Sequence, residues 1–329
     1  MAIDVRFLAG SEIEEHDAGT LPSLLARDDG ITWVDIPACD AEAQHALSDV
    51  FGFHPLAVRS CVERTRVPKV HAYKDHVFVV LHGPERGRAG HIHYVELDLF
   101  VGPNYLVTVH GPVNPAVEPA VALRETRAVL ERIEAGRLRP KESFELLYAV
   151  ISAMARTMEG LVEELTSDAW RLEQLVTSGD IDHSEDFLED LFQTRHGLLA
   201  VRTMAVLNRE IFDRVATVAR FVPEEGGPFI DDLVEQFDRV LGIANGQKDY
   251  VEGVIEHYRT RTETKMTIAA ERLAVIAVIT LPITALASVY GMNVIVNDDT
   301  DLVHLAIVLL VMAAMSATLL RWAKRQGWW

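Results

Sequence analysis

The stretch LAVIAVITLPITALASVY, residues 273–290, decides how this chain is organised. It carries no charged side chain, and a second uncharged stretch, 302–320, follows after a short polar segment. Each stretch is close to the ~20 residues that an α-helix needs to cross the hydrocarbon core of a bilayer. The sequence therefore predicts two membrane-spanning helices, over 273–291 and 302–320. Two buried core helices of a soluble protein are the alternative.

Charge and composition limit what the rest of the chain does. The chain has 329 residues and a formal net charge of -18, which excludes a nucleic-acid partner because phosphate binding needs a basic face. Its two cysteines, Cys39 and Cys61, favour neither a disulfide framework nor a thiolate zinc site. The N-terminus lacks the apolar run of a secretory signal, so we expect most of the chain in the cytoplasm.

Basic residues around the two spans predict their orientation. They precede the first span and follow the second, whereas the intervening segment, 292–301, has no Lys or Arg. By the positive-inside rule, both termini, including the 321–329 tail, are cytoplasmic, and 292–301 is an outer loop of a multi-pass protein of the inner (plasma) membrane. Acids in that loop either concentrate cations at a pore mouth or are simply solvated. These acids are Asp298, Asp299 and Asp301.

The residues before the spans predict a cytosolic α/β domain followed by long helices. Strand-like and helix-like runs alternate over 1–140. Over 141–222 the apolar residues repeat every three to four positions with one break, which predicts two long antiparallel helices. A third helix has no proline before Pro282, so 228–272 is expected to be a cytosolic stalk that continues into the first span. The predicted fold class is an α/β cytosolic domain plus a long helical stalk and two transmembrane α-helices.

One face of the first span carries groups suited to lining a pore. Counting back from Asn293 in helical steps, side chains with hydroxyl groups near the outer end give way to apolar ones further in. Two alternatives stay open: Asn293 can cap a helix that ends at Gly291, and the hydroxyls can bond back to their own backbone. The predicted pore-lining residues are Ser288, Thr284, Leu281, Ala277, Leu273, Ala270 and Met266.

The first span closes with Tyr290-Gly291-Met292-Asn293. In this position the motif resembles the signature of the CorA magnesium-transporter family, a Gly-Met-Asn tripeptide at the outer end of the next-to-last helix. The stretches 51–56 and 67–78 resemble the family as well. The resemblance implies that Gly291, Met292 and Asn293 form the selectivity filter. Two spans cannot enclose a water-filled path, so several copies must associate, and the resemblance implies a funnel-shaped homopentamer in the lipid bilayer.

The resemblance also implies the function, a channel for divalent cations that conducts Mg2+ and also Co2+ or Ni2+. Mg2+ would be both the transported and the regulatory ion, with no organic cofactor. Neutral carboxamides suit Mg2+, because this ion gives up the water molecules of its hydration shell reluctantly. Family members close when intracellular Mg2+ occupies acids between cytosolic domains. By position, the regulatory ligands would be Asp232, Glu256 and Glu85; solvated surface acids are the alternative.

Two other functions compete with this one. A zinc transporter of the same superfamily is possible because imidazole nitrogen suits softer cations. A membrane-tethered enzyme or a membrane anchor without transport is an alternative of another class. The sequence has no nucleophile elbow, phosphate-binding glycine loop or paired metal-hydrolase histidines, so we do not expect an enzyme. The histidines behind the zinc alternative are His71, His76, His82, His91 and His93.

Overall fold

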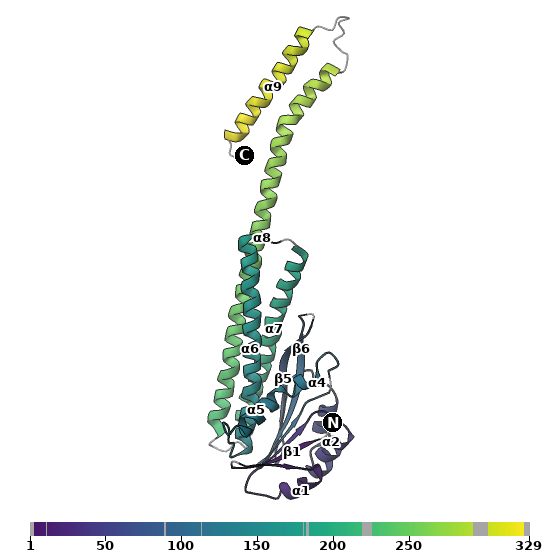
Figure 1. The fold of residues 1–329 in the computed structure, drawn as a ribbon, viewed down its shortest axis with the longest axis vertical. Helices are drawn as coiled ribbons and strands as arrows, with labels where there is room; N and C mark the ends of the chain where they lie inside the picture. Colours follow the sequence, from purple (N-terminus) through teal and green to yellow (C-terminus); the bar gives the residue numbers. More distant parts are fainter. Residues whose placement is uncertain are drawn as a thin grey trace. The chain divides into compact units, whose positions relative to one another are not determined.

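The chain divides into two units, Met1–Val254 and Ile255–Trp329. The first unit holds a β-sheet with its helices, and the second holds the apolar C-terminal helices (Figure 1). The structure, a computed structural model, describes residues 3–10, 12–88, 90–112, 114–179, 181, 184–218, 226–291 and 302–325.

A seven-stranded sheet forms the N-terminal part of the first unit. Its strand order is β2-β1-β3-β7-β6-β5-β4; β3 and β7 run parallel, and the other neighbouring strands run antiparallel. All six residues of β3 are buried, as expected for a central strand covered on both faces. The strands are β1 Asp4–Ala9, β2 Glu12–His16, β3 Ile31–Ile36, β4 Lys69–Ala72, β5 Val77–Arg86, β6 Ile92–Val101 and β7 Tyr105–Val109.

Short helices between β2 and β4 connect strands and cover one face of the sheet. On that face, Cys61 packs into an apolar core with Phe78 and Phe100. Local signals start the helices: the Asp40 carboxylate accepts the Ala43 N–H at 3.0 Å, and Pro55 occupies a first helical turn. These helices are η1 Ala18–Thr20, α1 Leu21–Leu24, α2 Ala41–His45, η2 Ala46–Val50 and α3 Pro55–Val62. Two further short helices, α4 Pro119–Ala122 and α5 Arg124–Glu134, follow β7, and α5 contacts the long helix that begins at Ser143.

Two long helices, α6 (Ser143–Ser178) and α7 (Ser184–Val218), contact the strands from the other side and each other. Both lie within the range 141–222. The first ends at Gly179, whose φ of +84° is the left-handed conformation that glycine adopts easily. Asn208, which is fully buried on α7, hydrogen-bonds the backbone of His82 in β5. This side chain therefore ties the helical layer to the sheet.

The longest helix, α8 (Gly227–Gly291), has 65 residues and belongs to both units. In the first unit it packs on α6 and α7: the rings of Tyr148 and Phe229 lie 5.0 Å apart, and those of Phe212 and Phe237 stack at 5.8 Å. The predicted stalk and the predicted first span are thus parts of one helix.

The second unit contains the rest of α8 and α9 (Leu302–Arg325). Both helices are long and apolar enough to cross a membrane, and only 6% and 0% of their most apolar windows is buried inside the chain. A core helix of a soluble protein would be mostly buried, so this exposure argues against that alternative. The predicted fold class is confirmed: an α/β domain, a long helix and two apolar C-terminal helices.

Some elements were not predicted. Strands β1, β2 and β4 and helix α3 have four to eight residues each, too few for a clear period of two or 3.6. On α7, Phe192 is 58% exposed and Leu188 and Leu199 are exposed as well, although apolar residues recur there every three to four positions. Apolar periodicity indicates the type of an element more reliably than which of its residues is buried.

Candidate ion pathway and cytosolic cation sites

One side of the C-terminal part of α8 is shielded by α9. Buried or half-buried side chains recur every three to four residues on both helices, and α9 runs beside this part of α8 (Figure 1). On α8 they are Val275, Val278, Ile279, Pro282, Ile283 and Leu286. On α9 they are Val308, Met312, Met315, Ser316, Leu319 and Ala323. These two stripes therefore form the contact between the helices.

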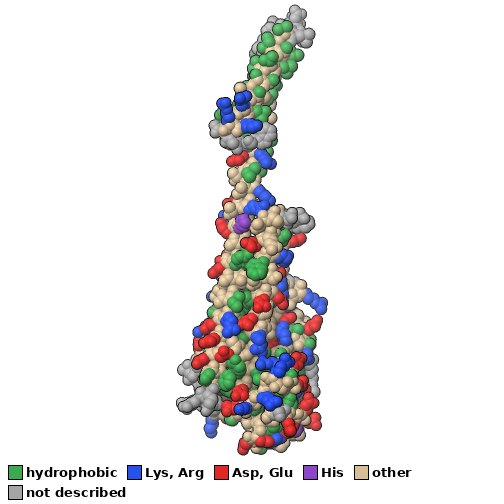
Figure 2. Space-filling model, turned by 60° about the vertical axis from the view of Figure 1, so that its left-hand side comes forward, with side chains coloured by type: hydrophobic (Ala, Val, Ile, Leu, Met, Phe, Trp, Pro, Cys, Tyr) green, Lys and Arg blue, Asp and Glu red, His purple; other side chains and the backbone are tan. Residues whose placement is uncertain are grey.

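The predicted pore-lining side chains lie on the other side of α8. Each residue turns an α-helix by about 100°, which puts the centre of this face about 180° from the stripe against α9. Met266, Leu273 and Leu281 are 69%, 67% and 66% exposed. Figure 2 shows many hydrophobic side chains on the surface of the apolar part of the second unit. Of the other predicted members, Ala270, Thr284 and Ser288 are exposed and Ala277 is half-buried.

The threonine hydroxyls of this segment bond back to the helix. Thr284 Oγ1 donates to the Thr280 carbonyl at 2.8 Å, and Thr280 Oγ1 donates to the Ile276 carbonyl at 2.9 Å. Pro282 lacks the N–H that would serve the Val278 carbonyl. The hydroxyl proton of Thr284 is thus used within the helix, as one of the alternatives in the sequence analysis held, and the residue is exposed.

The predicted filter lies at the limit of the described residues. Gly291 is the last residue of α8 and is exposed. Met292, Asn293 and the outer-loop acids Asp298, Asp299 and Asp301 lie outside the described residues.

Asp232, a predicted regulatory ligand, is held by hydrogen bonds within its own chain. Its Oδ2 accepts from the Tyr148 hydroxyl at 2.6 Å and from Gln236 Nε2 at 2.5 Å. The Tyr148 hydrogen bond, followed by that from Gln236, lowers the pKa of Asp232, so the carboxylate is ionised at neutral pH. The side chain is half-buried. One chain therefore presents this carboxylate charged and oriented.

The other two predicted ligands are not gathered around Asp232. Glu256 is exposed on α8, 24 residues further along the helix. Glu85 accepts a hydrogen bond from Arg124 Nη1 at 2.9 Å, which already compensates its charge. Among the described residues of one chain, no group of three or more His, Cys, Asp or Glu side chains is placed to hold a metal ion.

The five histidines behind the zinc alternative do not converge. His71 and His91 are exposed, and His76 is buried with its Nδ1 2.7 Å from the Asp75 carboxylate. His82 is buried with its Nε2 2.8 Å from the Thr65 carbonyl, and His93 is half-buried on β6.

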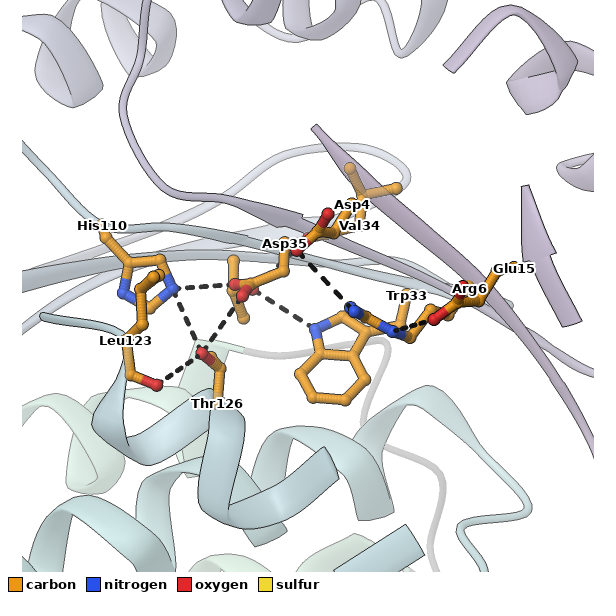
Figure 3. A network of polar contacts seen from close by, with 10 residues as sticks. Asp4, Arg6, Glu15, Trp33, Val34, Asp35, His110, Leu123 and Thr126 are labelled. Carbon is orange, nitrogen blue, oxygen red and sulfur yellow. Dashed lines mark hydrogen bonds and ion pairs between the residues drawn. The ribbon is translucent and has the colours of Figure 1, made fainter. Parts of the chain in front are cut away.

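A buried polar network that sequence reasoning missed joins β3, β7 and α5 (Figure 3). The Asp35 carboxylate contacts His110 Nε2 at 2.8 Å and accepts from the hydroxyls of Thr126, at 3.1 Å, and Thr108. Burial raises the pKa of Asp35, but the His110 charge and these hydrogen bonds outweigh it, and the net pKa is lowered. The parallel register of β3 and β7 brings these residues together, and no local sequence signal reveals it.

A second missed feature is a pair of buried acids on β6. Glu96 and Asp98 are 7% and 0% exposed. Burial raises the pKa of Glu96 to about 7, and burial together with the Glu96 charge raises that of Asp98 well above its usual value. The sequence does carry a signal here, because two acids at alternate positions interrupt an apolar strand.

Comparison with known proteins identifies the family to which the sequence is similar. A model described as CorA-like Mg2+ transporter protein matches residues 28–325. The cobalt/magnesium transport protein CorA of Thermotoga maritima is 23% identical over 298 residues, which cover 88% of this chain and 82% of that protein.

Two solved structures have a similar fold. The complete CorA magnesium transporter from Methanocaldococcus jannaschii superposes with a TM-score of 0.81 at 14% identity, covering 100% of this chain and 99% of that one. The ZntB cytoplasmic domain from Vibrio parahaemolyticus superposes with a TM-score of 0.61 at 9% identity, covering 80% of this chain and 100% of that one. Since the family model matches most of the sequence, the chain belongs to the CorA-like Mg2+ transporter family, a family of membrane transporters.

Proposed function

We propose that several copies of this chain form a membrane channel for divalent cations, with Mg2+ as the main ion and Co2+ or Ni2+ as further substrates. The observation that carries the proposal is the face of α8 from Met266 to Ser288, which stays exposed opposite the stripe covered by α9. A single chain leaves this face without a protein partner among its described residues, and copies of the same helix around an axis would supply one.

The chemistry of the proposed path suits a hydrated ion. Gly291, Met292 and Asn293 would form the selectivity filter, where neutral oxygen ligands contact Mg2+ without stripping it of water. Below them, Thr284 and Ser288 add oxygens, and the apolar side chains deeper in form a constriction that can close by dewetting. The acids of the 292–301 loop would concentrate cations at the outer mouth.

The proposed assembly is a homopentamer in the inner (plasma) membrane with both termini in the cytoplasm. Lys324 and Arg325 in the last turn of α9 support this orientation, because positive residues remain on the cytoplasmic side. No organic cofactor and no enzymatic activity are part of the proposal. Light scattering of the detergent-purified protein measures the subunit number, and a monomer that still transports would refute the shared pore.

Intracellular Mg2+ would close this channel by binding at Asp232, Glu256 and Glu85, each between neighbouring copies. The oriented carboxylate of Asp232 supports its role, since a second chain could complete its coordination. Glu85 would first have to release Arg124. Without bound cation, like charges on adjacent copies repel and favour opening.

Zinc transport is the second candidate, and the fold shared with the ZntB cytoplasmic domain favours keeping it. The two candidates differ in the ion that is preferred. Competition for uptake between Mg2+, Co2+ and Zn2+ separates them.

The decisive experiment is divalent-cation flux into liposomes that hold the purified protein. We expect wild type to conduct Mg2+, Asn293→Ala to lose most of this flux, and Asn297→Ala, which removes an amide from the same loop, to keep it. Equal Mg2+ flux through wild type and Asn293→Ala would refute the filter assignment.

The proposed closure of the channel by internal Mg2+ is tested separately. Asp232→Asn should raise the internal Mg2+ concentration needed for closure, whereas Asp231→Asn, an exposed neighbour that changes the net charge equally, should not. An equal effect of both substitutions would indicate general surface charge instead of a site.

A further inference from the structure

One residue between α3 and β4, Thr65, is held at both of its backbone polar groups by buried titratable side chains. Its N–H donates to Glu96 Oε2 at 2.8 Å, and its carbonyl oxygen lies 2.8 Å from His82 Nε2. A carbonyl oxygen only accepts, so His82 Nε2 carries the proton of this hydrogen bond. Glu96 and His82 are 7% and 3% exposed and are paired across β6 and β5. We call residues 63–68 the clasp loop.

Most of the clasp loop lies at the surface. Arg64, Arg66 and Val67 are exposed, whereas Pro68 at the end of the loop is buried. Arg64 Nη2 donates to the Tyr94 carbonyl at 3.3 Å, but the Arg64 side chain is exposed. A segment with few buried side chains opens at a lower free-energy cost than the sheet beneath it. The two hydrogen bonds at Thr65 therefore contribute much of what keeps the loop closed.

The acid beneath the loop carries a proton up to about neutral pH. Burial raises the pKa of Glu96 to about 7, and the Thr65 hydrogen bond and the charges of Lys69 and Arg64 oppose this rise. Asp98, two residues along on the same face of β6, is fully buried, and burial followed by the Glu96 charge raises its pKa well above the usual value. Water that reached Glu96 through an open loop would return its pKa toward the ordinary 4.5.

We propose that the clasp loop is a pH-operated flap, which is closed on the sheet when Glu96 is protonated and opens more often when Glu96 is ionised. Ionisation strengthens the hydrogen bond from Thr65, but the raised pKa of Glu96 shows that the cost of the buried charge exceeds this gain. The closed loop binds the proton more tightly than the open loop. This contribution to closure is therefore complete below pH 4.5 and is lost as the pH rises through 7.

His82 acts on the loop with the opposite sign. Burial lowers the pKa of His82, although the hydrogen bond to Thr65 opposes the change. The closed loop thus favours the neutral imidazole, and this contribution to closure is present above pH 6.5 and is lost as the pH falls. Above pH 6.5 the titration of Glu96 remains, so the loop of the wild-type protein opens more often as the pH rises through 7.

The other titratable groups around Glu96 leave this titration in place. Burial raises the pKa of the Cys61 thiol on α3 well above its ordinary value and that of Cys39 to about 11, so both thiols stay neutral. Two further groups line a small cavity beside Glu96: Glu118 is exposed, and His110 belongs to the buried network of β3, β7 and α5.

Deuterium exchange of the Thr65 amide tests the proposal in the purified full-length protein at pH 6 and pH 8, with each rate corrected for intrinsic exchange at that pH. In His82→Gln, whose amide can still donate to Thr65, Glu96 titrates alone, and protection should fall about tenfold from pH 6 to pH 8. In Glu96→Gln, His82 titrates alone, and protection should rise, by at most about fourfold. Wild type should show a smaller fall than His82→Gln.

The control variant is Glu131→Gln, at an exposed position of α5, which should behave as wild type does. The amide of Leu106 in β7 reports on the sheet, and its protection should not follow that of Thr65. Parallel changes at Leu106 and Thr65 would mean that the whole unit opens, and a fall in Glu96→Gln equal to that of wild type would exclude Glu96 as the trigger; either result overturns the proposal.

Circular dichroism melting checks that each variant is folded. If His82→Gln or Glu96→Gln does not fold, the wild-type protein decides by itself, because the two amides are measured in the same sample. Thr65 protection that is equal at pH 6 and pH 8 would then show that the loop does not respond to pH. A fall at Thr65 with constant protection at Leu106 supports the flap.

Discussion

Asn208 of α7 hydrogen-bonds both backbone polar groups of His82 in β5: its Nδ2 donates to the His82 carbonyl at 2.9 Å, and its Oδ1 accepts the His82 N–H at 3.3 Å. The edge strand β4 pairs only with residues 77–80 of β5, so it does not reach His82. The side-chain amide of Asn208 thus forms the two backbone hydrogen bonds that a longer β4 would form with His82.

Asn208→Ala should therefore destabilise the first unit strongly. It leaves a buried N–H and a buried carbonyl unpaired, at about 1–3 kcal/mol each. Chemical denaturation of the purified protein, followed by circular dichroism, measures the loss. Asn245→Ala is the control, because Asn245 is only half-buried and its partner Arg202 can turn to water. Equal losses for both substitutions would contradict this account.

Glu96 should make the stability of the first unit depend on pH. The pKa of Glu96 is about 7 in the folded chain against an ordinary value of 4.5, so the folded state binds the proton more tightly. This contribution is fully present below pH 4.5 and is lost as the pH rises through 7. Glu96→Gln, which stays neutral, should melt at a higher temperature than wild type at pH 8, and the advantage should disappear near pH 4.5.

These melts need a chelator in the buffer to remove divalent cations. The nearby charges of Arg64 and Lys69 oppose the rise in the pKa of Glu96, and burial outweighs them. Glu131→Gln, at an exposed position of α5, is the control and should show no such pH dependence. A constant difference between wild type and Glu96→Gln from pH 4.5 to 8 would speak against a buried neutral carboxyl.

Tyr148 should tune the sensitivity of the proposed gate to Mg2+. Its hydroxyl occupies a lone pair of Asp232, and a hydrogen bond to a charged group is worth about 1.5–3 kcal/mol. Tyr148→Phe should lower the internal Mg2+ concentration that halves flux, on the order of tenfold. Tyr250→Phe removes a similar bond, to Glu173, and should leave the gate unchanged. A shift toward higher Mg2+ in Tyr148→Phe would reverse our assignment.

The two sides of α8 should differ in their access to water. Ser288 lies on the proposed pore face and Leu286 on the stripe against α9. In reconstituted protein, a membrane-impermeant thiol reagent should label Ser288→Cys several-fold faster than Leu286→Cys. Labelling of the unsubstituted chain gives the background from Cys39 and Cys61, of which Cys61 is buried. If Leu286→Cys reacted faster, the water-accessible path would lie on the side of α8 that faces α9, and our assignment of the pore face would be wrong.

The helices were predictable because an amphipathic or apolar helix repeats its pattern over many residues. The single helix from Gly227 to Gly291 was expected from the absence of proline before Pro282, and it continues through Gly242, Gly246 and Gly253 despite about 1 kcal/mol for each glycine relative to alanine. Packing of this helix on α6 and α7 compensates for that cost in the first unit.

The polar groups of the sheet were less predictable. Asp35 and His110 meet because β3 pairs with β7, and a pairing between distant strands leaves no local pattern. Glu96 and Asp98 did carry a signal, since acids at alternate positions of an apolar strand must share a face of the sheet. The proposed cation binding at Asp232 would need a second chain, and the residues of one chain cannot reveal its partner.

The parallel pair at the centre of the sheet also sets an order of events during synthesis. Trp33 faces Leu106 across β3 and β7, so the first strands emerge from the ribosome long before their central neighbour exists. Until Val109 has emerged, the nascent chain exposes an incomplete sheet, and such long-range pairing is slow. The apolar helices are made last. Chain order alone thus lets the first unit finish its sheet before the final helix is available for insertion into lipid.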